Sequence, residues 1–145
     1  MLERLLGRLR AAPHATPQED HRVAAAVLLL ELARADLEHH PAELAALREG
    51  LMRDFGVAEE TLDTLLSEAG EKAHRAVSLY DFVQALNARL GFDEKRALMR
   101  LLWRVARADG RVDPHEEHLL RQLGDLLHLS HGEFIQAKLD EEGRG

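Results

Sequence analysis

One segment of the sequence occurs twice, and this duplication constrains the fold more than any other feature. Leu28–Glu43 reads LLLELARADLEHHPAE, and it aligns without a gap on Leu101–Glu116, which reads LLWRVARADGRVDPHE. The tetrapeptide Ala-Arg-Ala-Asp is identical in both, and so are a later proline and glutamate. Because the match includes a turn as well as an apolar period, we interpret it as one helix–turn–helix hairpin present in two copies. Packed face to face, the copies would bury stripes that neither buries alone.

Apolar residues recur at helical spacing along the chain, and no segment alternates in the manner of a strand. We therefore expect an all-α fold, a single-domain helical bundle of about seven to eight helices built from two related helix-turn-helix halves. Residues 1–17 are expected to form an amphipathic helix and linker, and residues 18–142 the helical domain, with halves at about 18–75 and 78–142. Proline, glycine and capping residues predict where the helices begin and end. The first helix is expected to end near residue 12, and the next five are expected over residues 18–36, 41–55, 59–75, 78–90 and 93–108. The last two are expected to begin at residues 114 and 130, and the final helix to fray into DEEGRG.

The helix expected over residues 93–108 has the widest apolar face. One stripe is formed by Leu98, Leu101, Leu102 and Val105, and a second by Met99, Trp103 and Ala106. Such a face predicts a position in the middle of the bundle. The remaining face carries Arg96, Arg100, Arg104 and Arg107. We interpret these arginines as partners for carboxylates of neighbouring helices; the alternative is a docking face for an acidic segment or a lipid headgroup.

Composition excludes several classes of function. The chain has 26 acidic and 19 basic residues and a formal net charge of −7, so bulk attraction to nucleic acid is not expected. It has no cysteine, which excludes thiol catalysis, disulfides and thiolate metal sites. The longest apolar run, Val23–Ala33, is interrupted by Glu31 and is short for a membrane span, so we expect a cytoplasmic protein. The stripe of Leu2, Leu5, Leu6 and Leu9 predicts that the first helix packs on the bundle or mediates self-association, with contact to a membrane surface as the alternative.

The turn of the second copy has a purely structural interpretation. Gly110 can adopt the left-handed conformation that ends a helix. Asp113 is a good N-cap, Pro114 suits the first helical position, and Glu116 completes a pattern resembling a capping box. This interpretation accounts for four residues without a ligand, but it does not explain the acid that precedes the glycine.

The alternative interpretation is a cation site built on calcium-loop chemistry. With Gly110 at the sixth position of such a loop, Asp109 is fifth and Glu116 is the chelating twelfth residue. The first and third positions would be Val105 and Arg107, which are not ligands, so we favour the caps. The three carboxylates Asp109, Asp113 and Glu116 could still hold a hard cation weakly, or with help from another segment. A buried, converging cluster of carboxylates would support the metal, and carboxylates splayed outward on two separate turns would support the caps.

The segment from Trp103 to Phe134, WRVARADGRVDPHEEHLLRQLGDLLHLSHGEF, resembles the second signature of the tellurite-resistance TerB-like family. The resemblance extends from about Val23 to Lys138. It implies an all-helical protein linked to tellurite and other chemical stress, without an established enzyme activity, whose acidic turns have been suggested to bind metal. Site residues implied by the resemblance are Asp109, Asp113 and Glu116, with Asp36 and Glu43 as their counterparts. The first copy departs from the pattern, because Leu37 replaces the glycine and His39 the aliphatic residue, although His39 and His40 could themselves be ligands.

Together these observations predict a non-enzymatic binding or scaffold protein of bacterial stress response. Protein partners are expected, nucleic acid is not, and the only cofactor considered is a divalent metal cation at the acidic turns. Two alternatives stay open: a metal-dependent enzyme or metal sensor, and a purely structural interaction module whose turns are only caps.

Overall fold

The computed structural model describes residues 17–35, 41–76 and 78–143, and within these ranges every regular element is an α-helix. This confirms the predicted all-α fold. The helix expected to end near residue 12 lies outside the described residues. The described helices are α2 (Pro17–Ala35), α3 (Pro41–Phe55), α4 (Glu59–Arg75), α5 (Tyr80–Arg89), α6 (Phe92–Arg107), α7 (Pro114–Leu126) and α8 (His131–Gly143).

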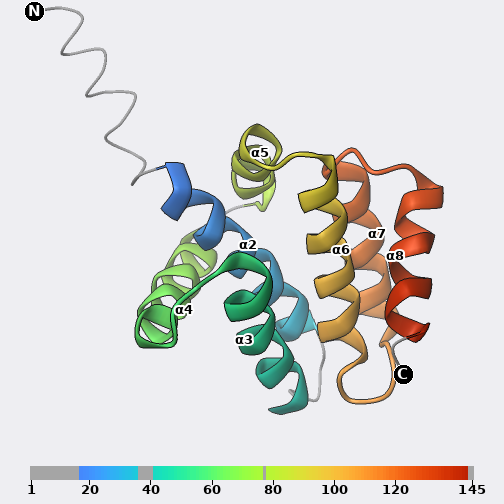
Figure 1. Ribbon diagram of the computed structural model, residues 1–145, viewed down its shortest axis with the longest axis horizontal. Coiled ribbons are helices and arrows are strands. Elements are labelled where there is room, and N and C mark those ends of the chain that lie inside the picture. Colours follow the sequence, from blue (N-terminus) through green and yellow to red (C-terminus); the bar gives the residue numbers. More distant parts are fainter. Residues whose placement is uncertain (1–16, 36–40, 77, 144–145) are drawn as a thin grey trace, which may run out of the picture.

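Two helices, α2 and α6, organise the bundle (Figure 1). Every residue of α2 from Val23 to Leu29 is buried, because this helix packs against α3, α4, α5, α6 and α7. Helix α6 packs against α2, α3, α7 and α8, and all seven residues of its two predicted stripes are buried. The position predicted for α6 from its wide apolar face is therefore confirmed. None of the described helices combines the length and apolar composition needed to cross a bilayer.

The repeated segment forms the same kind of hairpin in both places. Helix α3 begins at Pro41 and α7 begins at Pro114, which is the repeated proline. Helix α2 packs on α3, and α6 packs on α7. The end of α2, the start of α3, the end of α6 and the start of α7 all lie toward the lower end of the molecule in Figure 1. The duplication therefore places the helix ends that flank the two repeated turns at one end of the bundle.

The two copies meet where α3 lies against α6. A side chain at Gly50 would overlap the buried side chain of Leu101, so the absence of a Cβ allows these helices to approach closely. Four residues further along α3, Asp54 forms an ion pair with Arg104 of α6, with 3.6 Å between the charged atoms. One face of α3 thus combines an apolar contact with an electrostatic one.

Most helix ends lie within two residues of their predicted positions, but the last helix is longer than predicted. The prediction was that this helix begins at Ser130 and frays in the polar tail, DEEGRG. Instead, α8 continues through Asp140, Glu141 and Glu142 to Gly143. The reason is that Glu141 is buried and held by an arginine of α6.

Candidate functional site

The turn between α6 and α7 is built as the structural interpretation predicts. Gly110 has a φ of 98°, in the left-handed region that favours glycine. The Asp113 carboxylate accepts a hydrogen bond from the His115 backbone N–H at 2.7 Å. The Glu116 carboxylate accepts one from the Asp113 backbone N–H at 3.1 Å, completing a capping box. Two of the three predicted ligands are thus engaged in starting α7.

Asp109 also has a local structural role, which the sequence pattern did not explain. Its Oδ1 accepts a hydrogen bond from the Arg111 backbone N–H at 3.2 Å, across Gly110. Aspartate commonly makes this bond to the backbone two residues on, because its short side chain mimics one arm of a turn. The side chain is only partly buried, so it also faces the solvent at this end of the bundle.

Each repeat buries a carboxylate in the first turn of its second helix. Glu43 and Glu116 occupy equivalent positions in α3 and α7, and they are 1% and 0% exposed. A carboxylate is costly to bury unless its oxygens are hydrogen-bonded, so its presence in both copies is a specific feature of this end. Of the acidic pair predicted for the first turn, only Glu43 falls in the described part of the chain. Asp36 lies outside it.

The described residues do not by themselves make a metal centre. Across residues 17–35, 41–76 and 78–143, no group of three or more His, Asp or Glu side chains is placed to hold a metal ion. Asp109, Asp113 and Glu116 each accept a hydrogen bond from a backbone N–H of the turn. A cation at this end would therefore need a further ligand, and Asp36, His39 and His40, the candidates predicted from the sequence, lie outside the described residues.

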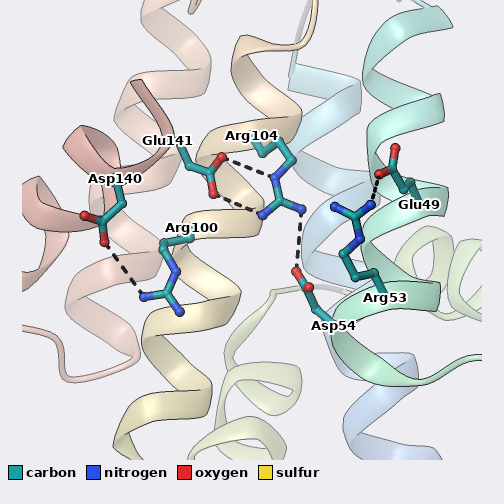
Figure 2. Close-up of polar contacts among 7 residues, drawn as sticks. All are labelled: Glu49, Arg53, Asp54, Arg100, Arg104, Asp140 and Glu141. Carbon is teal, nitrogen blue, oxygen red and sulfur yellow. Dashed lines mark hydrogen bonds and ion pairs between the residues drawn. The ribbon is translucent and has the colours of Figure 1, made fainter. Parts of the chain in front are cut away.

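A second cluster of charged residues lies between α3, α6 and α8 (Figure 2). Nε and Nη2 of Arg104 donate to the two oxygens of Glu141, at 3.2 and 3.0 Å, in the paired geometry that suits a guanidinium and a carboxylate. The Glu141 side chain is only 3% exposed. The hydrogen bonds with Glu141 raise the pKa of Arg104 above its ordinary value. Nearby, Nη1 of Arg100 in α6 lies 4.0 Å from Oδ2 of Asp140 in α8.

This cluster confirms that Arg100 and Arg104 pair with carboxylates of neighbouring helices. It also compensates an unfavourable charge pattern, since α8 has acidic residues and no basic one in its last turn, where the helix dipole is negative. Sequence analysis did not find Glu141. Its signal is the spacing of Phe134, Ala137 and Glu141, which places the acid on the buried face of α8. We assign the cluster to the packing of α8.

Fold and site together define a class of protein: a helical bundle of two related hairpins, with a capped acidic turn between α6 and α7. The particular family follows from comparison with known proteins. A family model described as "Tellurite resistance protein TerB" matches residues 22–139. The chain therefore belongs to the TerB family, as the resemblance of its second turn predicted.

A solved structure shows the same fold. It is the crystal structure of the protein of unknown function PG1108 from Porphyromonas gingivalis W83, which is similar to this chain with a TM-score of 0.64 and 21% sequence identity. The similarity covers 90% of this chain and 98% of the other. No curated protein matches the chain.

Proposed function

We propose that this protein is a non-enzymatic binding or scaffold component of a bacterial response to tellurite or related chemical stress, acting in the cytoplasm on protein partners. Membership of the TerB family supports the connection to stress. The observation that carries the proposal is that the helix ends flanking both repeated turns lie at one end of the bundle, on helices that hold Glu43 and Glu116 in the interior. Helix ends gathered at one end of a bundle suit recognition, because they offer charge on a rigid frame.

A divalent cation is the ligand that this end suits best, and its binding is weak. Asp109 supplies a carboxylate at a solvent-facing turn, and the fixed positions of Asp113 and Glu116 hold that turn in shape. A hard cation takes six or more oxygen ligands, so further donors must come from water and from the turn that includes Asp36. Weak binding follows because few of the ligands are supplied by rigid protein groups.

Thermal unfolding tests the cation. We expect millimolar calcium, magnesium or manganese to raise the melting temperature of the wild type, because a ligand that binds only the native state stabilises it by mass action. Asp109→Asn should abolish this shift, because the substitution removes a charge while keeping size and much of the hydrogen bonding. Asp113→Ala is the matched control: it should destabilise the protein by about 1 kcal/mol with or without cation, through the lost cap.

A wild type whose melting temperature ignores all three cations would contradict cation binding and leave the turn as a cap alone. The link to stress is tested separately by deleting the gene and measuring growth in tellurite. Reduced tolerance, restored by the wild-type gene, is the expected result. If the Asp109→Asn gene also restores tellurite tolerance, the role in stress does not require cation binding at Asp109.

A further inference from the structure

Helices α2 and α4 form the walls of an open groove of about 340 Å³. Its apolar lining consists of Val23 from α2, Val57 from the α3–α4 connection, and Leu65 from α4. Thr61 and Thr64 add small side chains, Arg22 adds a guanidinium and Glu68 adds a carboxylate. The groove therefore combines an apolar strip with one charge of each sign, and the α4 wall continues beyond it into the exposed acids Glu59, Glu60 and Asp63. That chemistry fits an apolar helix face flanked by basic residues.

The chain contains a segment of that chemistry next to the groove. Residues 1–12 read MLERLLGRLRAA, with leucines at positions 2, 5, 6 and 9, three arginines and a single glutamate. The segment is joined to α2 by residues 13–16, and Val23 of the groove lies fewer than two helical turns after the first residue of α2. Four extended residues can span about 13 Å, which lets the segment fold back along the start of α2.

The dimensions and charges of segment and groove also match. Leu2 and Leu9 are seven positions apart, and so are Thr61 and Glu68 along the wall formed by α4. In helical geometry each interval covers about 10 Å. Helix α4 carries the exposed acids Glu59, Glu60, Asp63 and Glu68, of which Glu68 lines the groove, whereas the segment is basic. Opposite charges that flank an apolar contact fix its register.

From these observations we infer that residues 1–12 dock as an amphipathic helix in the groove between α2 and α4 of the same chain, with the leucine stripe against Val23, Val57 and Leu65. The groove is then the site of an intramolecular contact between the start of the chain and its first repeat. The inference stands independently of the acidic turns at the end of the bundle.

Thiol accessibility in the full-length chain tests this contact, because the protein has no cysteine of its own. Thr64 is exposed within the described residues and lines the groove, so Thr64→Cys reports on whether the groove is covered. We expect the combined substitution Leu5→Asp and Leu6→Asp to raise the rate of Thr64→Cys modification by a disulfide reagent about tenfold, by releasing the segment. Ala11→Asp adds a charge on the opposite side of the leucine stripe and should leave the rate unchanged.

Two further measurements make the result decisive. Gln136→Cys, at an exposed position on α8, should react at the same rate in every background, which shows that the bundle remains folded. Equal rates for Thr64→Cys in the Leu5→Asp/Leu6→Asp and Ala11→Asp backgrounds would overturn the inference. Protection of Thr64→Cys that is lost on dilution would also overturn it, since the groove would then hold the segment of a second copy.

Discussion

Gly50 shows how a single residue sets the distance between the two repeats. A methyl group there would overlap the side chain of Leu101, which is fully buried. We expect Gly50→Ala to lower the free energy of unfolding by about 1–3 kcal/mol, the usual cost of overpacking. Gly70→Ala on α4 is the matched control, because no atom lies within 4 Å of the added group. It should stabilise the protein by up to about 1 kcal/mol through helix propensity.

Urea denaturation followed by circular dichroism measures both glycine variants. The expected result is a change of opposite sign in the two proteins. Stabilisation by Gly50→Ala would mean that α3 and α6 do not approach at this residue as described.

Trp103 is among the largest of the fully buried side chains, with 1% exposure. The centroid of its ring lies 5.2 Å from the centroid of the Phe134 ring. Its burial was predicted from the second apolar stripe. Trp103→Ala should therefore cost about 3–5 kcal/mol. Phe92→Ala, at a position that is 52% exposed, should cost less than about 1 kcal/mol. Denaturation measured by circular dichroism compares the two, and the emission maximum of the wild type should be that of a buried indole.

These residues show what a sequence pattern can predict and what it cannot. The period of apolar residues in α6 was enough to predict that Trp103 points inward, since helical geometry decides which side chains share a face. It could not predict Gly50, because nothing in the sequence of α3 indicates that Leu101 will lie opposite. Contact between residues far apart in the chain depends on how the helices cross.

At the scale of one element, α8 is held by a buried ion pair at its acidic end. Glu141→Gln should lower the free energy of unfolding by about 1–3 kcal/mol, because Arg104 loses a charged hydrogen-bond partner. Asp140→Asn is the matched control on the adjacent residue. Its pair with Arg100 has 4.0 Å between the charged atoms and is more exposed, so the cost should be below about 1 kcal/mol. Equal losses in the two variants, measured by urea denaturation, would show that burial adds nothing to the Glu141 pair.

The start of α8 gives a prediction about pH. Hydrogen bonds from the Ser130 hydroxyl, and then from the Ser130 backbone N–H, lower the pKa of Glu133 below its ordinary value of 4.5. A lowered pKa in the folded state means that the ionised form stabilises the fold above the ordinary pKa. This contribution is lost as pH falls through the folded pKa. Ser130→Ala should move the pKa of Glu133 back toward 4.5, which a carbon-13 titration of the carboxyl group measures. An unchanged pKa would show that the hydroxyl does not hold this carboxylate.

The caps of α7 could be predicted from the sequence because their interactions are local, whereas the ligands of a cation need not be. Gly110, Asp113 and Glu116 interact within one turn of chain, so their roles follow from local sequence. The proposed cation at Asp109 depends instead on donors that are distant in the sequence, which only tertiary structure can bring near it. The expected fraying of α8 was wrong for a related reason, since Arg104 and Glu141 lie in different helices.

At the scale of the whole molecule, the two repeats share one core. Helix α2 belongs to the first repeat but packs against α6 and α7 of the second, and α3 packs against α6. The buried apolar residues of both repeats form a single cluster. A core of this kind leaves neither repeat with a complete interior of its own, so the described helices should unfold together.

Leu62→Ala tests whether the repeats unfold as one unit. Leu62 lies in α4 of the first repeat and is 1% exposed, so its truncation should cost about 2–5 kcal/mol. Trp103, the single tryptophan, lies in α6 of the second repeat with its ring against Phe134 and Lys138 of α8, so its fluorescence reports on the packing of these two helices. If the shared core couples the repeats, Leu62→Ala should shift the urea midpoint of the Trp103 signal by the same amount as the midpoint of the circular dichroism of all helices. A tryptophan midpoint that stays at its wild-type value while the dichroism splits into two transitions would show that the repeats are independent. The single-core description would then be wrong.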